Sequence, residues 1–76
     1  MSPRLPALKP REVIRALEGA GFFLHHVTGS HHFLRHPDRP AVRVTVPMHN
    51  RDLKRGTLAA IIKESGLSLE EFIDLL

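Results

Sequence analysis

The fold is decided by residues 22–46, which read FFLHHVTGSHHFLRHPDRPAVRVTV. The first six, residues 22–27, are dense in aromatic and β-favouring side chains and too few for a helix, so they predict a strand. Residues 28–30, Thr-Gly-Ser, have the composition of a tight turn. Residues 31–36 then predict a second strand, which returns alongside the first.

A third strand follows a strongly marked connection. Residues 37–40 are Pro-Asp-Arg-Pro, and two prolines with an aspartate are typical of a hairpin connection. Over residues 42–46, valines alternate with Arg43 and Thr45, which is the period-two pattern of a strand with one buried and one solvated face. Pro47 ends this strand.

Helices are expected before and after the strands in the sequence. Residues 10–20 begin with proline, which suits the first turn of a helix, and carry apolar side chains at helical spacing up to a stop at Gly21. A second helix is expected to begin at Thr57 as its N-cap and to end at Gly66.

A third, short helix is predicted after the second. Ser68 and Glu71 have the spacing of a capping box, in which each side chain bonds the other residue's amide. The apolar stripe of this helix comprises Leu69, Phe72, Ile73 and Leu76. Its acidic face would suit the basic part of the chain, but packing of the stripe is the stronger expectation, because these side chains would otherwise be exposed.

The predicted order is helix, three antiparallel strands, helix and short helix, which is an α+β fold. Two helices suffice to cover one face of a three-stranded sheet, giving the αβββα arrangement of double-stranded-RNA-binding domains. One domain is expected over residues 9–76, with residues 68–76 as an additional C-terminal helix, after a flexible segment over residues 1–8. A fold of this kind does not determine function.

Length and composition restrict the class of protein. A chain of 76 residues has room for one domain with a modest core. It contains no cysteine, which suits a cytoplasmic protein and leaves no disulfide or thiolate metal site. The apolar runs are far shorter than the roughly 20 residues that span a bilayer, and no signal peptide is recognisable, so we expect a cytoplasmic protein that does not bind membranes.

Charge is distributed unevenly along the chain. The net charge is only +3, but residues 29–55 contain six Arg and Lys against two Asp, together with four histidines. Residues 64–76 carry four acidic side chains and no basic one. The middle of the chain is therefore suited to a polyanion, and RNA is the first to consider.

The run Gly29-Ser30-His31-His32 places two imidazoles directly after a turn. Histidine is the side chain whose unperturbed pKa lies near neutral pH, so it gives or accepts a proton under cellular conditions. RNA carries its own nucleophile, the 2′-hydroxyl, so one imidazole in a cationic surface supports cleavage without a metal. His31 and His32 are the catalytic candidates. Adjacent strand residues point to opposite faces, and the sequence leaves open which of the two faces the core.

The residues expected to bind RNA are those of the turn, whose amides can approach a phosphate, and the basic side chains that follow. They are Gly29, Ser30, Arg35, Arg43, Arg51, Lys54 and Arg55. Phe33 either stacks on a base or belongs to the core. His25 and His26 are assigned to the sheet surface or the edge of the core, and His36 to added charge. His49, in the basic connector, either contacts a phosphate or is a surface residue without a role in binding. The histidine spacings match no zinc motif, so no metal or other cofactor is expected.

Several segments together resemble one known family. They are Gly29 to Pro37 (GSHHFLRHP), Val44 to Pro47 (VTVP), Asp52-Leu53, Gly56-Thr57-Leu58 and Ile61-Ile62. In this order they are similar to the HicA toxins of the YcfA/HicA-type mRNA interferase family, and the resemblance covers residues 9–67. It implies a double-stranded-RNA-binding-like fold, cleavage of mRNA that arrests growth, and a HicB-type antitoxin that covers the active site.

The resemblance also implies where the site lies. The family's catalytic histidine follows a glycine-serine pair and falls on His31, with Gly29 as the motif glycine. Some members carry the histidine one position later, which corresponds to His32, so both stay candidates and His31 is favoured. Family members often end near the position of Leu67, so the helix over residues 68–76 is an addition.

These observations predict the toxin of a type II toxin–antitoxin system. It would be a metal-independent endoribonuclease that uses His31 as general base or acid, with His32 as second candidate. The alternative is a non-catalytic RNA-binding module of the same fold, and a third possibility is a protein-interaction domain whose histidines are incidental. No oligomeric state is assigned from the sequence.

Overall fold

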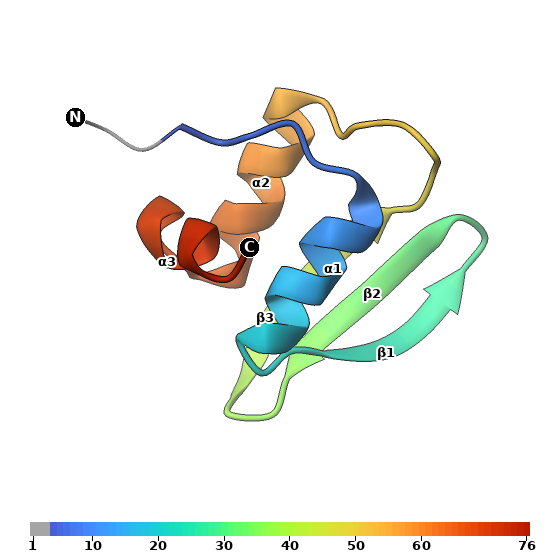
Figure 1. Ribbon diagram of the computed structural model, residues 1–76. Helices are drawn as coiled ribbons and strands as arrows, with labels where there is room; N and C mark the ends of the chain where they lie inside the picture. The colour runs from blue at the N-terminus through green and yellow to red at the C-terminus, as the bar shows by residue number, and fades with distance from the viewer. Residues whose placement is uncertain (1–3) are drawn as a thin grey trace.

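The computed structural model describes residues 4–76; residues 1–3, the start of the predicted flexible segment, lie outside the described residues. An antiparallel sheet in the order β1-β2-β3 is packed on one face by helices, as Figure 1 shows. This arrangement confirms the predicted α+β fold. The elements are α1 (Pro10–Gly19), β1 (Phe23–Thr28), β2 (His31–His36), β3 (Arg39–Pro47), α2 (Arg55–Ser65) and α3 (Leu69–Asp74).

Helix α1 begins at Pro10, as predicted. The carboxylate of Glu12 accepts a hydrogen bond of 3.0 Å from the amide of Lys9 and so satisfies one of the donors left free at a helix start. The helix ends at Gly19, one residue earlier than expected, and the chain turns at Gly21, whose φ is 99°. Its buried side chains, which face the sheet, are Pro10, Val13, Ala16 and Leu17.

The β1–β2 hairpin has a two-residue turn at Gly29 and Ser30. Gly29 has φ 56° while Ser30 does not have a positive φ, which is the φ pattern of a type II′ turn with glycine in its first central position. The turn matches the twist of the strands, so it fixes their register. Strand β1 begins one residue later than predicted, because the amide of Phe22 donates a 3.0 Å hydrogen bond to the carbonyl of Leu17 in α1.

Strand β3 is longer than the valine pattern predicted. The turn after β2 occupies only residues 37–38, and Arg39 and Pro40 already belong to β3. In the described sheet β3 pairs only with β2, and a proline is tolerated in such an edge strand. The prediction that residues 37–40 form the connection was therefore too wide.

The core lies between the helices and one face of the sheet. From the sheet it takes Leu34, Val44 and Val46, each at most 1% exposed. Leu8 is also buried, and its carbonyl accepts a 2.8 Å hydrogen bond from the amide of Leu53. Leu5 packs against the same core. Residues 5 and 8 were assigned to the flexible segment, yet they contribute to the packing.

Helix α2 starts earlier than predicted, because Lys54, and not Thr57, is the N-cap. The carbonyl of Lys54 accepts a 2.9 Å hydrogen bond from the amide of Leu58, which closes the first helical turn before Thr57 can cap it. The predicted end is confirmed: Gly66 lies in the left-handed region with φ 78°. None of the helices within residues 4–76 has the length and apolar character needed to cross a membrane.

Helix α3 confirms the capping box of Ser68 and Glu71. The amide of Glu71 donates to the Ser68 hydroxyl over 3.0 Å, and the amide of Ser68 donates to the Glu71 carboxylate over 2.9 Å. Phe72 is fully buried, while Leu76 at the end of the stripe is half exposed. The expected packing is therefore confirmed for Phe72 and for Leu69, which packs against the core, whereas Ile73 is half-buried outside this core cluster and Leu76 is exposed.

Candidate functional site

Strand β2 separates the two candidate histidines. Leu34 is completely buried and points to the helices. By the alternation of a strand, His32 and His36 lie on the same side as Leu34. His31 lies with Phe33 and Arg35 on the opposite side, which we call the open face. The structure thus decides what the sequence left open.

His31 has a fixed backbone and an exposed ring. It is paired with Thr28 of β1 and with Pro47 of β3, at the end of the sheet. The adjacent Ser30 carbonyl accepts a 2.6 Å hydrogen bond from the amide of Met48, which attaches the turn to the loop after β3. The ring makes no hydrogen bond within the described part of the chain, and its centroid lies 6.5 Å from that of Phe33. Both nitrogens are therefore available to a ligand.

His32 lies in a more apolar place. It is half-buried, and its neighbours across the sheet are Val27 and Val46. Val46 is completely buried, whereas Val27 is 49% exposed at the edge strand β1. Aliphatic neighbours offer no charge stabilisation for a reacting phosphate, so His32 has the weaker surroundings of the two candidates.

The turn beside His31 carries free amides. Within residues 4–76 the amides of Gly29 and Ser30 donate to no backbone carbonyl outside the strand ladder. Nothing lies within 4 Å of the position that a Gly29 side chain would take, so a phosphate has room to approach the backbone there. Successive amides of this kind form an anion-binding concavity.

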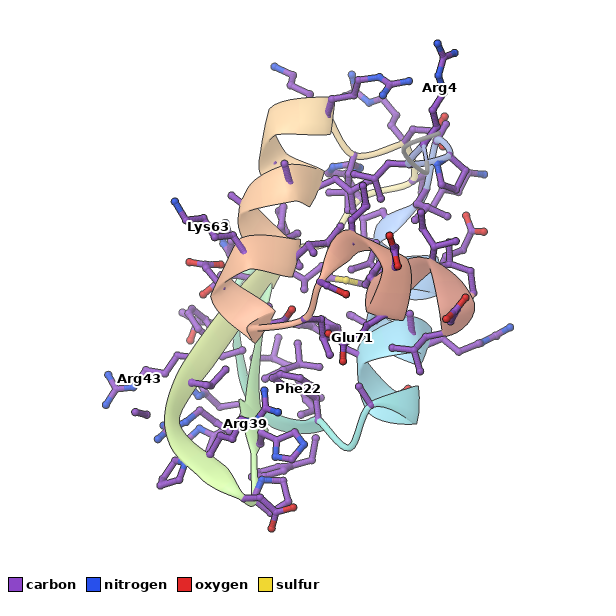
Figure 2. The ribbon with its side chains drawn as sticks, turned by 90° about the vertical axis from the view of Figure 1, so that its left-hand side faces the viewer. Arg4, Phe22, Arg39, Arg43, Lys63 and Glu71 are labelled. Carbon is purple, nitrogen blue, oxygen red and sulfur yellow. The ribbon has the colours of Figure 1, made fainter. Side chains whose placement is uncertain are left out.

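Two of the predicted phosphate ligands share the open face. Arg35 and Arg43 are direct partners across β2 and β3. Arg35 Nη2 donates a 2.9 Å hydrogen bond to the carbonyl of Pro40, while its Nε is buried and has no partner in the described residues. Arg43 is exposed and extends away from the helices (Figure 2). Arg35 lies four residues along β2 from His31, roughly 13 Å at the usual rise of a strand, and Arg43 lies opposite Arg35 on β3, so neither is a neighbour of His31 in the sheet.

The other predicted phosphate ligands belong to the loop after β3. Arg51 and Lys54 line a hollow of about 260 Å³ together with His49 and Asp52. The loop is held in shape because His49 Nδ1 accepts a 3.1 Å hydrogen bond from the amide of Arg51. Arg55 is the exposed first residue of α2. The basic residues thus form two groups, one on the sheet and one along the loop.

His36 has a structural role that was not predicted from the sequence. Its Nδ1 accepts a 3.1 Å hydrogen bond from the amide of Asp38, so in the neutral ring Nε2 carries the proton. Nε2 then donates to the carbonyl of Ala20 over 3.0 Å. The ring also meets Phe22 edge-on, with 5.0 Å between centroids. His36 joins the end of β2 to the chain after α1.

His26 takes part in an aromatic pair that sequence reasoning missed. The register of β1 shifts between Leu24 and His26, so His25 is an extra residue that reverses the alternation beyond it. His26 consequently lies on the open face beside Phe33, and their rings stack with 4.4 Å between centroids and 5° between planes. Phe33 is half-buried on this face and outside the core. Sequence alternation alone gives no sign of the bulge.

The histidines do not gather into a metal site. Within residues 4–76, no three His, Asp or Glu side chains lie close enough to hold a metal ion together. His25 and His26 are neighbours in β1, with 2.7 Å between their Nδ1 atoms.

A comparison with known protein families matches the part of the chain that contains the candidate site. The family model described as the HicA toxin of bacterial toxin–antitoxin systems matches residues 10–67, from the start of α1 to just after Gly66. The match includes all three strands and both candidate histidines, and it stops before α3. No curated protein matches the chain. Because the family model covers well over half of the sequence, the chain belongs to the HicA family of toxins of bacterial toxin–antitoxin systems.

Proposed function

We propose that this toxin is a metal-independent endoribonuclease that cleaves mRNA and uses His31 as its proton-transfer group. The observation that carries the proposal is the position of His31. Its ring is exposed on the open face, it has no hydrogen-bond partner within residues 4–76, and it adjoins a turn with free amides. A sugar–phosphate backbone could therefore contact the His31 ring and the turn amides together.

The cleavage step follows from this arrangement. His31 takes the proton of a ribose 2′-hydroxyl, whose oxygen attacks the adjacent phosphorus. The bond from phosphorus to the 5′-oxygen of the next nucleotide breaks, and that oxygen receives a proton from the imidazolium. The products are a 2′,3′-cyclic phosphate and a free 5′-hydroxyl. The amides of Gly29 and Ser30, in the adjoining turn, are the donors proposed for the charge that develops on the phosphate.

His32 is the second candidate for the same role. It would require the RNA to reach the helix-covered side of β2, next to Val27 and Val46. The difference in exposure between the two rings favours His31.

The basic residues are proposed to hold the RNA on either side of the cleaved bond. Arg35 and Arg43 would bind phosphates that pass over the sheet, and Arg51, Lys54 and Arg55 would bind those along the loop and the start of α2. Guanidinium and ammonium groups supply affinity of this kind without regard to sequence.

A HicB-type antitoxin is the proposed partner. An acidic surface of this partner that covers the open face would neutralise the arginines and close access to His31 together. An mRNA substrate also implies that the toxin acts in the cytoplasm.

A non-catalytic RNA-binding module is the second candidate function. It is favoured by one observation: Arg35 and Arg43 do not adjoin His31, so the sheet presents a cationic surface that does not depend on a histidine.

One assay distinguishes the two functions. The chain is incubated with a single-stranded RNA in EDTA, and the ends of the products are determined. The proposal predicts cleavage with 2′,3′-cyclic phosphate ends. Binding without cleavage would favour the module, and products with 5′-phosphates would indicate attack by water and contradict the mechanism.

A further inference from the structure

The open face carries an aromatic and cationic cluster that the cleavage step leaves unexplained. We call it the open-face cluster, and it comprises His26, Phe33, Arg35, Arg43 and Thr45. These side chains line a hollow of about 300 Å³ together with Leu34 and Val44. The helices of the described chain lie on the other side of the sheet (Figures 1 and 2). The hollow is therefore open to a ligand.

The aromatic part of the cluster is already arranged for stacking. His26 and Phe33 are parallel within 5°, at 4.4 Å between ring centroids. Thr45 is the partner of Phe33 on β3, so a small polar side chain borders the aromatic pair on the side opposite His26. A planar ligand in the hollow would extend the stack, and a nucleobase is such a ligand. Base–aromatic stacking is tolerant of sequence because every base has a π-face.

The cationic part of the cluster points to an anion. Like charges directly opposite each other across a sheet are unfavourable, yet Arg35 and Arg43 are such a pair. No acidic side chain lines the hollow. The hydrogen bond to Pro40 holds the Arg35 guanidinium in place, while Arg43 stays exposed. A phosphate bound at this face would be attracted by both positive charges.

The cluster continues directly into the proposed catalytic position. Along β2 the open face presents His31, Phe33 and Arg35 in succession. The centroids of the His31 and Phe33 rings lie 6.5 Å apart. A nucleotide whose base stacks on Phe33 would thus place a neighbouring phosphodiester next to His31.

We infer that the open face of the sheet binds unpaired RNA, with one base stacked on the Phe33–His26 pair and its phosphate on Arg43 and Arg35. The inference rests on the proposed function, and it adds the substrate class: single-stranded RNA and not duplex. Bases in a duplex are stacked inside the helix and cannot reach these rings. Binding of bases by the sheet surface also differs from the way double-stranded-RNA-binding domains recognise the shape of an RNA duplex.

Binding is tested apart from cleavage. The His31→Ala chain is titrated by fluorescence anisotropy into three probes of equal length: a single-stranded RNA, the duplex of the same sequence, and an abasic strand that keeps the phosphates. The single strand is expected to bind most tightly. Phe33→Leu in this background is expected to lower its affinity about 10-fold, in keeping with the loss of one stacked base, and to leave the abasic strand unaffected.

Two exposed positions keep the test valid if Phe33→Leu fails to fold. His26→Ala is expected to weaken binding of the single strand by roughly 2- to 3-fold, since it removes only the support of the Phe33 ring. Arg43→Gln is expected to weaken the single strand and the abasic strand alike, and to reduce the slope of log affinity against log salt by about one. Arg15→Gln, exposed on α1 and bordering Leu75 and Leu76 away from the loop, is the matched charge control and should change neither.

Several results would overturn the inference. These are equal or tighter binding of the duplex, equal binding of the abasic strand, unchanged affinity in the folded variants at Phe33 and His26, or no affinity for any RNA, as expected of a face that binds only protein. The cleavage proposal can fail while the binding inference holds. If the native chain leaves RNA intact while these binding results hold, single-strand binding stands and the nuclease does not.

Discussion

Nε2 of His36 donates a hydrogen bond to the carbonyl oxygen of Ala20 over 3.0 Å and so ties the end of β2 to the chain that leaves α1. The same ring accepts from the amide of Asp38 and packs edge-on against Phe22. His36→Ala is expected to lower the free energy of unfolding by about 2 kcal/mol, because it removes two hydrogen bonds and a packed ring. Urea unfolding followed by circular dichroism measures this loss. His31→Ala is the control and should change stability by less than about 0.5 kcal/mol; equal losses would contradict the role of His36.

Gly21 leaves room for the His36 ring because it has no side chain. A Cβ at this position would lie 2.8 Å from His36 Nε2, and the backbone has φ 99°. Gly21→Ala is therefore expected to destabilise the fold by roughly 2 kcal/mol, from backbone strain and from steric contact. Combining it with His36→Ala should remove the steric part, so the double variant should lose less than the sum of the two single losses. Additive losses would mean that the two residues are not coupled.

Gly56 provides the comparison for Gly21. It lies in α2, and nothing stands within 4 Å of a Cβ built on it. Gly56→Ala should leave stability unchanged or raise it by about 0.5 kcal/mol, because alanine has the higher helix propensity.

Helix α3 is expected to be part of the folding unit, although the family match ends at residue 67. Phe72 is completely buried, whereas Leu76 is 51% exposed. Phe72→Ala should cost about 3 kcal/mol or more in a core of this size. Leu76→Ala should cost less than about 1 kcal/mol, since little of its surface is removed from water. Thermal unfolding of both variants checks the contrast, and similar melting temperatures would show that α3 is peripheral.

The capping box of α3 should make stability depend on acid pH. Hydrogen bonds with the backbone and side chain of Ser68 lower the pKa of Glu71 below its ordinary value of 4.5, and the charge of Arg39 acts in the same direction. A lowered pKa in the folded state means that the contribution is complete above pH 4.5 and is lost as the pH falls through the folded value. The native chain should therefore lose stability in this range more steeply than Glu71→Gln.

Glutamine is the informative substitution because it keeps the acceptor of a capping box but does not titrate. Unfolding free energies at pH 6 and pH 3 give the comparison. If the native chain and Glu71→Gln lose the same stability between these values, the Glu71 carboxylate does not contribute to the pH dependence.

Most of the fold was predictable because apolar residues recur at the spacing of a strand or of a helix. The alternation of valines in β3 and the apolar spacing of α1 predict which faces are buried, and Gly66 and Ser68 mark two helix termini correctly. The start of α2 was missed because Thr57 has the composition of an N-cap while the closing hydrogen bond is made by the Lys54 backbone. A hydrogen bond between two backbone groups cannot be recognised from the types of side chain in the sequence.

The candidate site was predictable only in part. The turn glycine and the two histidines were evident as a motif, but the face of each depended on which side of β2 the helices cover. The pairing of His26 with Phe33 depends on a bulge at His25, a single extra residue that reverses the alternation. His36 was assigned to added charge because its partner, Ala20, lies 16 residues away and bonds through its backbone.

The rate of RNA cleavage by His31→Ala and His32→Ala, each shown by circular dichroism to be folded, tests the central claim most directly. The two side chains are neighbours in β2 and on opposite faces, so each variant is the control for the other. Loss of the proton-transfer group should slow cleavage by His31→Ala about 100-fold or more, and free imidazole should restore part of the rate, while His32→Ala stays within about 10-fold of the native chain. Full activity of His31→Ala, or loss of activity in His32→Ala alone, would contradict the account.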